Sequence, residues 1–171
     1  MESKTSIVIG LALLVFIGLF VWGYIGNGGS TASVQGVNQT SAMQTMLRTS
    51  ATVFDFGTIS MKNGLVTKEF TVTNPTERDI TVTTLVTSCM CTAAYFVLPD
   101  GTAKGPFGMP GMGSVPPVRE VIEAGASRIV RVVYDPNAHG PAGVGRIDRF
   151  VELTDASGGA LEFEIMANVT P

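Results

Sequence analysis

Apolar and polar residues follow two different patterns along this chain. Residues 7–25 form an apolar run, IVIGLALLVFIGLFVWGYI, without a charged side chain. Such a run is long enough to cross the hydrocarbon core of a bilayer, about 30 Å thick, as a helix. Lys4 precedes it, and Trp22 and Tyr24 lie near its far end, where amphipathic rings favour the headgroup layer. The pattern predicts an uncleaved signal-anchor over residues 1–25, with the remainder of the chain outside the cytoplasm.

The alternative for this segment is a cleaved signal peptide. The apolar run exceeds the ~7–15 residues usual for one, and no clear A-x-A cleavage site follows it. Residues 26–50 then change to Gly, Ser, Thr, Gln and Asn, with few residues able to build a core. This composition predicts a flexible tether between the anchor and a folded domain.

From residue 51 onward, apolar and polar positions alternate in short segments separated by Gly, Pro, Asn and Asp. In DITVTTLV, for example, Ile80, Val82 and Val86 are expected on one face of a strand. The pattern predicts about seven strands, at 52–56, 66–73, 80–87, 93–98, 128–134, 146–153 and 161–169. Their number and spacing are typical of an all-β immunoglobulin-like β-sandwich, which we expect over residues 51–171.

Composition and charge reduce the number of function classes that fit this chain. The chain has 171 residues and a net charge of −3, with few and scattered Lys and Arg side chains. This length allows one domain plus an appendage, and the lack of a basic patch excludes a nucleic-acid partner. His139 is the only histidine, and the motifs of serine hydrolases, zinc proteases and phosphate-binding loops are missing from the sequence. We therefore expect that the protein is not an enzyme.

Six motifs in order resemble a known bacterial family. They are FDFGTI (54–59), FTVTNPT (70–76), TSCMCT (87–92), IEAGAS (122–127), VVYDPNAHGPAGVGRIDR (132–149) and LEFEIMANV (161–169). Together they are similar to the domain-of-unknown-function family fifteen-seventy-three, over nearly all of residues 51–169. The resemblance implies an exported, commonly anchored domain of immunoglobulin type, related to ciliary ASH domains and PapD-like chaperones. It implies no established activity.

Both cysteines of the chain lie in the TSCMCT motif, as Cys89 and Cys91. In an extended strand their side chains would share one face, with Cα atoms about 6.6 Å apart. This separation is close to the upper limit for a disulfide, so a bond there would be strained and easily reduced unless the backbone turns. Three interpretations are open: small buried apolar side chains, a disulfide, or a site for a soft metal ion. We favour packing or a simple disulfide, because further metal ligands are not contiguous in sequence.

The further ligands of a metal site would have to come from elsewhere. Met109 and Met112 lie in a long Gly- and Pro-rich insert at 99–118, and thioether with thiolate ligands selects Cu(I). Cys89, Cys91, Met109 and Met112 therefore make up the alternative copper site, with Met90 or His139 as other donors. His139 lies in a turn-forming stretch, DPNAHGPAG. We expect its ring to be satisfied by local backbone rather than by a metal.

The insert at 99–118 is also longer than the ~12–15 residues of ordinary connections, as is typical of binding loops. Phe107 with Met109 and Met112 would form an adaptable apolar patch for a protein or peptide, and His139 is a further candidate residue of this binding loop.

These observations lead to one expected function and one alternative. The first is a single-pass, membrane-tethered, extracytoplasmic binding or scaffolding module that works without a cofactor. By analogy with PapD-like domains, its sheet edges or loops would bind a protein or peptide by strand addition. The alternative is a copper-binding or thiol-redox protein that uses the cysteine pair with methionines of the insert.

Overall fold

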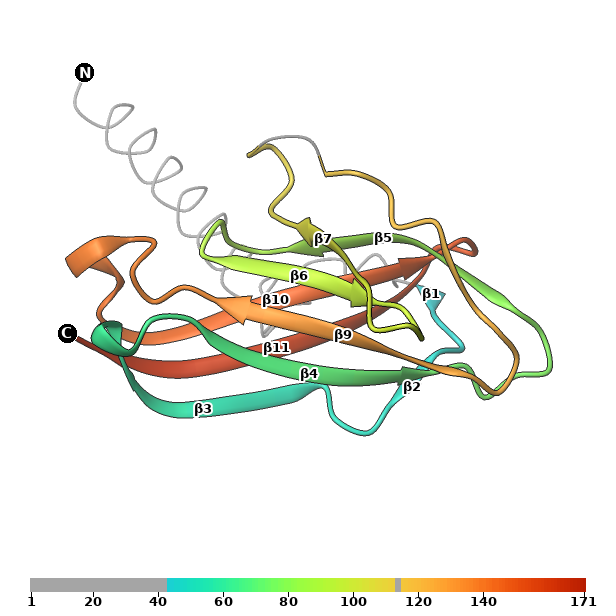
Figure 1. The fold of residues 1–171 in the computed structure, drawn as a ribbon, viewed down its shortest axis with the longest axis horizontal. Helices are drawn as coiled ribbons and strands as arrows, with labels where there is room; N and C mark the ends of the chain where they lie inside the picture. Colours follow the sequence, from blue (N-terminus) through green and yellow to red (C-terminus); the bar gives the residue numbers. More distant parts are fainter. Residues whose placement is uncertain (1–42, 113–114) are drawn as a thin grey trace, which may run out of the picture. The chain divides into compact units, whose positions relative to one another are not determined.

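The structure, a computed structural model, describes residues 43–112 and 115–171. They form two β-sheets (Figure 1). The predicted anchor at 7–25 and the first part of the predicted tether lie outside the described residues. Within the two described ranges, no helix has the length and hydropathy needed to span a bilayer.

The first sheet has six strands. Five follow the order β1 (Met43–Gln44), β11 (Gly159–Thr170), β10 (Gly145–Asp155), β5 (Ile80–Thr87) and β8 (Glu120–Ile122), and β3 (Val53–Ser60) also pairs with β11. Both β1 and β3 run parallel to β11, at different stretches of it, and the other pairs in this sheet are antiparallel.

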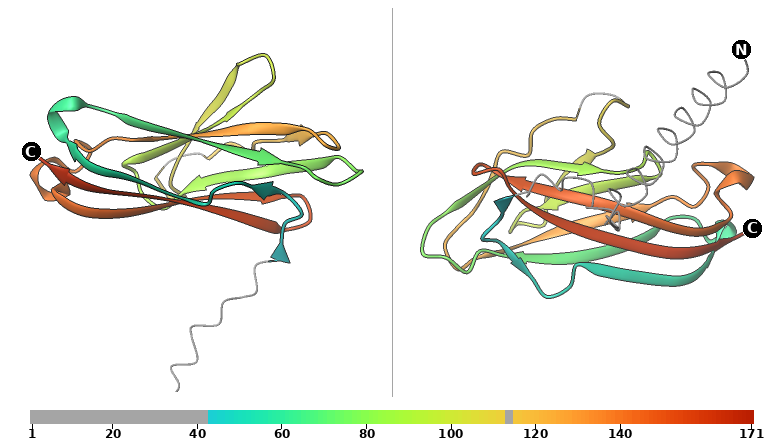
Figure 2. Two further views of the ribbon diagram at one scale, coloured as in Figure 1. Left: turned by 90° about the horizontal axis from the view of Figure 1, so that it is seen from below. Right: turned by 180° about the vertical axis from the view of Figure 1, so that it is seen from behind.

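The second sheet has five antiparallel strands. Their order is β2 (Arg48–Thr49), β4 (Val66–Thr73), β9 (Ser127–Tyr134), β6 (Thr92–Val97) and β7 (Ala103–Phe107). Two short 3-10 helices, η1 (Met61–Asn63) and η2 (Gly140–Gly143), lie in connections. The turned views in Figure 2 show the two sheets as two layers.

The strand order is that of an immunoglobulin domain. Strands β2, β4, β5, β6, β9, β10 and β11 can be taken as seven successive strands. The first, second, fifth and fourth then form one sheet, and the third, sixth and seventh form the other. The first strand is divided, because β2 pairs in one sheet and β3 in the other. The predicted immunoglobulin-like sandwich is therefore confirmed, and each of the seven predicted segments contains a strand.

The core lies between the layers and follows the predicted alternation. Phe70 from one sheet and Phe163 from the other are buried, with ring centroids 4.7 Å apart. One expected face was wrong: Leu85, rather than Val86, is buried with Val82. The register of β5 on β10 shifts between Thr84 and Val82, and such a bulge reverses the alternation after it.

Two predicted boundaries need correction. The domain begins before residue 51, because Thr45 and Leu47 are buried and residues 43–49 contribute β1 and β2. The predicted tether thus extends too far at its C-terminal end. The insert at 99–118 is also partly regular, since β7 lies within it and extends the second sheet.

Candidate thiol–disulfide site

Residues 88–91, which we call the cysteine turn, connect β5 to β6 and so carry the chain from one sheet to the other. The Thr92 amide donates to the Cys89 carbonyl at 3.1 Å, and the Thr87 hydroxyl donates to the carbonyls of Cys89 and Thr92, both at 3.1 Å. Ser88 ties the turn to β10: its amide donates to the Phe150 carbonyl, and its hydroxyl accepts from the Phe150 amide, both at 2.9 Å. The turn is therefore fixed to both sheets.

A disulfide joins Cys89 to Cys91, whose Cα atoms are 5.3 Å apart. This distance is shorter than expected for an extended strand, because the backbone turns here. The strand geometry predicted for the pair is therefore wrong, whereas the disulfide interpretation agrees with the structure. Cys91 is 2% exposed, Cys89 is half-buried, and Met90 between them is exposed. The two sulfurs thus differ in their access to solvent.

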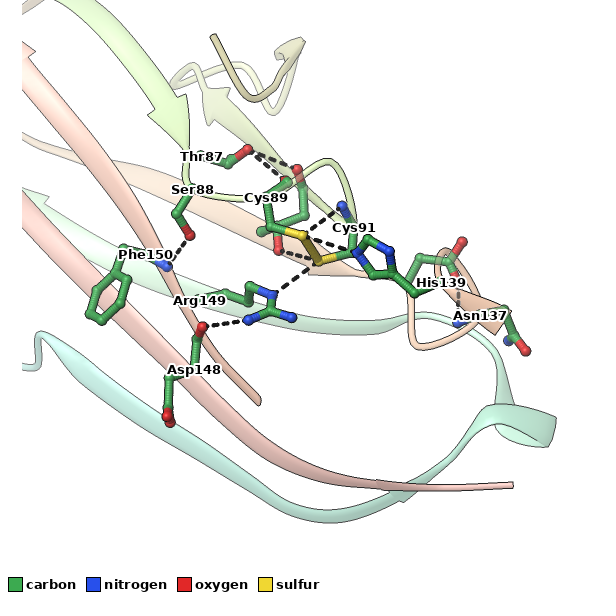
Figure 3. The surroundings of a disulfide bond; sticks show 11 residues. Thr87, Ser88, Cys89, Cys91, Asn137, His139, Asp148, Arg149 and Phe150 are labelled. Carbon is green, nitrogen blue, oxygen red and sulfur yellow. Dashed lines mark hydrogen bonds between the residues drawn. A yellow bond between two sulfur atoms is a disulfide. The ribbon is translucent and has the colours of Figure 1, made fainter. Parts of the chain in front are cut away.

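His139 approaches the disulfide from a loop far along the chain (Figure 3). The Asp135 amide donates to the Cys91 carbonyl at 2.9 Å, which holds the start of this loop against the cysteine turn. The imidazole Nε2 of His139 then lies 3.3 Å from Cys89 Sγ, and the residue is exposed. The prediction that local backbone satisfies this ring is wrong, since the ring contacts sulfur.

Arg149 lies next to the second sulfur. Its Nε donates to Cys91 Sγ at 3.2 Å, and its Nη1 donates to the Asp148 carbonyl at 2.8 Å. The positive charge of Arg149 also acts on the buried Tyr134, whose pKa is raised by burial against the opposing effect of this guanidinium. The sequence analysis missed Arg149. Its position on β10 two residues after buried Ile147 and two before buried Val151, on the core side, was the available signal.

The residues predicted for the binding loop do not form one surface. Phe107 is 2% exposed and belongs to the core, so it cannot contribute to an exposed apolar patch. Met109 is half-buried and Met112 is exposed, in the loop after β7. The Thr87 amide donates to the Gly108 carbonyl at 3.2 Å, which fixes the start of that loop beside the end of β5. A copper-binding role for these methionines stays a prediction.

Three potential metal-ligating side chains come together within the described parts of the chain: Cys89, Cys91 and His139. Their ligand atoms all lie within 4.8 Å of one another. A thiolate formed at either cysteine would have a basic side chain beside it, which stabilises the charged, reactive form of sulfur. The site can therefore exist as a disulfide or as two supported thiolates.

These features define an immunoglobulin-like domain with a disulfide turn between its sheets. Over residues 47–101, which include the cysteine turn, the chain matches the family described as "Protein of unknown function (DUF1573)". The resemblance stated from the sequence motifs is thereby confirmed for this segment. No curated protein matches the chain.

The solved structures that are similar to this chain have low sequence identity to it. A protein of unknown function from Porphyromonas gingivalis W83 is 15% identical, with a TM-score of 0.52, over 77% of this chain and 50% of that one. This chain thus spans half the length of that protein. The ASH/PapD-like domain 7 of human CEP192 is 14% identical, with a TM-score of 0.45, over 83% and 97% of the two chains. The chaperone CupB2 of Pseudomonas aeruginosa is 14% identical, with a TM-score of 0.38, over 71% and 55%.

Proposed function

We propose that this domain is an extracytoplasmic binding module whose Cys89–Cys91 disulfide exchanges with thiols of a partner protein. One observation supports this most directly: a half-buried sulfur beside an exposed histidine is bonded to a buried sulfur beside an arginine. A disulfide that only fastens the fold needs neither of these two neighbours.

The unequal burial of the sulfurs sets the order of the exchange. A partner thiolate attacks Cys89 Sγ, the more accessible atom, and a mixed disulfide forms while the Cys89–Cys91 bond breaks. The bonding electron pair leaves on Cys91, where the Arg149 guanidinium at 3.2 Å stabilises the thiolate. A second partner thiolate then attacks the partner's sulfur and releases Cys89 beside His139. The partner dithiol is oxidised to a disulfide, and the pair in this domain gains two electrons.

The same bond supports an oxidising compartment for the proposed function. Disulfides persist in oxidising compartments and are rare in the cytosol. This agrees with an exported domain held at a cell membrane by residues 7–25, as the apolar run suggests. The membrane attachment and the extracytoplasmic location are part of the proposal.

Strand addition at a sheet edge is the second candidate. Among the described strands, β4 pairs along its length with β9, but on its other side β2 covers only Val72 and Thr73. Residues 66–71 therefore offer an open edge to which a partner strand could add. This edge carries Lys68 and Glu69, and charged side chains are a common protection of edges against pairing. For that reason we place it second.

The test is to trap partners on single-cysteine variants of the full chain, expressed in its own oxidising compartment. In Cys91→Ser, the free Cys89 thiolate can attack a disulfide of an oxidised partner, which is the reverse of the exchange, and Cys91 is no longer there to displace the partner. We therefore expect a mixed disulfide that is seen on a non-reducing gel and is lost on a reducing gel. Cys89→Ser is the matched control, and its buried Cys91 should trap several-fold less. Equal trapping by both variants, or none by either, would contradict the exchange order and leave the disulfide as a structural bond.

A further inference from the structure

We propose that the reduced site binds one Cu(I) ion through Cys89 Sγ, Cys91 Sγ and His139 Nε2. This goes beyond the exchange reaction, because it uses the same residues but does not require any partner thiol. It also differs from the copper site expected from sequence, since a histidine replaces the methionines of the insert.

The distances between the three donor atoms are close to those around a bound metal ion. Metal bonds of about 2.3 Å to sulfur and 2.0 Å to imidazole nitrogen place two ligand atoms about 3.5–3.8 Å apart. Cys89 Sγ and His139 Nε2 are 3.3 Å apart, and all three donor atoms lie within 4.8 Å of one another. Once reduction breaks the bond, the sulfurs need to separate by about 1.5–2 Å. The hydrogen bonds of the cysteine turn already fix the backbone of both cysteines.

Independent anchors hold the donors from different parts of the fold. The cysteine turn is tied to β10 through Ser88 and Phe150, and the His139 loop is tied to the turn through the Asp135 amide. Backbone hydrogen bonds therefore position both ligand groups before any ion arrives. Preorganised ligands reduce the cost of ordering on binding. The exposed side chain of His139 leaves the site open to a donor of copper.

Charge selects the ion. Two thiolates and a neutral imidazole around Cu(I) carry one net negative charge, and the Arg149 guanidinium beside Cys91 neutralises it. The same ligands around Zn(II) would be neutral and would leave the arginine charge uncompensated in a half-buried position. Thiolate ligands also favour Cu(I) for their softness. The monovalent ion therefore fits the complete environment better.

The disulfide and the metal exclude each other, because bond formation consumes both thiolates. Only the reduced protein can bind copper. If the pair is oxidised by a disulfide of a partner, that partner takes up the two electrons and becomes a dithiol, while the Cu(I) ion is released unchanged.

The experiment is an anaerobic titration of the reduced full chain with Cu(I), in competition with a coloured Cu(I) chelator. We expect one Cu(I) per chain, and none for the disulfide form. His139→Leu should lower the affinity at least about tenfold, and because the residue is exposed we expect little effect on stability. Met109→Leu/Met112→Leu removes the alternative donors and should leave the affinity unchanged. Arg149→Gln should shift the preference from Cu(I) towards Zn(II).

Several results would overturn the inference. These are a lack of stoichiometric binding, equal binding by the oxidised protein, or a loss of affinity in the methionine variant but not in the histidine variant. X-ray absorption of the loaded protein gives a second readout, which should show both sulfur and nitrogen ligands. The outcome is separate from the partner-trapping experiment, since copper binding can be present without mixed disulfides and the reverse.

Discussion

Two polar turns flank strand β5. They differ in how completely neighbouring groups satisfy the hydrogen-bonding capacity of their side chains. The cysteine turn follows Thr87 at one end. At the other end, the Ala156 amide donates to the Thr81 carbonyl at 2.9 Å, which joins β5 to a second turn at 155–159, here called the Asp155 turn. Both turns thus hydrogen-bond β5 and β10 together at an end of β5, the cysteine turn through Ser88 and Phe150 and the Asp155 turn, which joins β10 to β11, through Ala156 and Thr81.

The Asp155 turn is a closed network. Asp155, 4% exposed, accepts from the amides of Ser157 and Gly159 at 2.8 and 3.1 Å, and from the hydroxyls of Ser157 and Thr45. Burial raises the pKa of this carboxyl, but these hydrogen bonds outweigh it and leave the pKa below its usual value. The carboxylate thus fastens the segment that carries β1 and β2 to the sandwich.

Backbone groups of the cysteine turn are hydrogen-bonded within the fold, but its Cys89 sulfur is accessible to solvent. The carbonyls of Cys89 and Cys91 are paired within the fold, whereas the Cys89 side chain is half-buried and its neighbour His139 is exposed. A satisfied, buried carboxylate contributes stability, and an accessible sulfur beside basic groups offers reactivity. This difference is the reason for assigning function to one turn and structure to the other.

Among the variants that test this comparison, Asp155→Ala is expected to have the largest effect on stability. The variant leaves the Gly159 amide and the Thr45 hydroxyl, both in buried residues, without this acceptor, and buried unsatisfied donors each cost about 1–3 kcal/mol. The Ser157 amide also loses its acceptor, but this residue is exposed and its amide can bind water. We expect the free energy of unfolding to fall by about 2–4 kcal/mol, measured by urea denaturation of the oxidised protein.

The pH dependence of Asp155→Asn provides the control. Because the folded pKa lies below 3.8, the ionised carboxylate contributes stability above that pH. The contribution is lost as the pH falls through the folded pKa, so the wild type should lose stability more steeply than the variant below about pH 4. Parallel pH profiles for the two proteins would show that Asp155 is not the group that titrates, and would weaken its assignment as the fastener.

Gly159→Ala tests how closely the N-terminal segment packs on the Asp155 turn. A Cβ at residue 159 would lie 2.6 Å from Thr45 Cα and 2.8 Å from its amide nitrogen, so the backbone must shift. We expect a loss of about 1–3 kcal/mol in the free energy of unfolding. Gly108→Ala is the matched control, because an added Cβ there meets nothing within 4 Å. Equal stabilities of the two variants would mean that β1 packs less tightly than described.

The sequence predicted the long strands because their alternation extends over many residues. It missed β1 and β2, which have two residues each, too few to show a period. It also missed β7, where Gly105 and Pro106 argue against a strand, and β8, which has three residues. Short edge strands are defined by their pairing partners, and a local pattern does not contain that information.

Only part of the site, the cysteine pair, could be identified from the sequence. A disulfide between Cys89 and Cys91 was one of the interpretations left open by the sequence, but His139 is 50 residues from Cys89 and needs the fold to reach it. An immunoglobulin sandwich pairs its fourth and fifth strands, and here that pairing places Thr92 opposite Tyr134. The residues flanking these two therefore meet, so the predicted topology already implied that the loop containing His139 lies beside the cysteine turn.

A substitution of His139 is expected to change stability least, and it therefore contrasts most clearly with the substitutions of Asp155. His139→Gln removes an exposed imidazole, so the free energy of unfolding should stay within about 0.5 kcal/mol of the wild type. The rate at which dithiothreitol reduces the disulfide at neutral pH should nevertheless fall several-fold. Cys89 leaves as a thiolate in the second step, and without the ring at 3.3 Å that supports this thiolate the mixed disulfide more often returns to the Cys89–Cys91 bond. Thiol counting against time and urea denaturation, done on the same preparation, separate these effects. A variant that loses more than about 1 kcal/mol but reacts at the wild-type rate would make His139 a structural residue like Asp155.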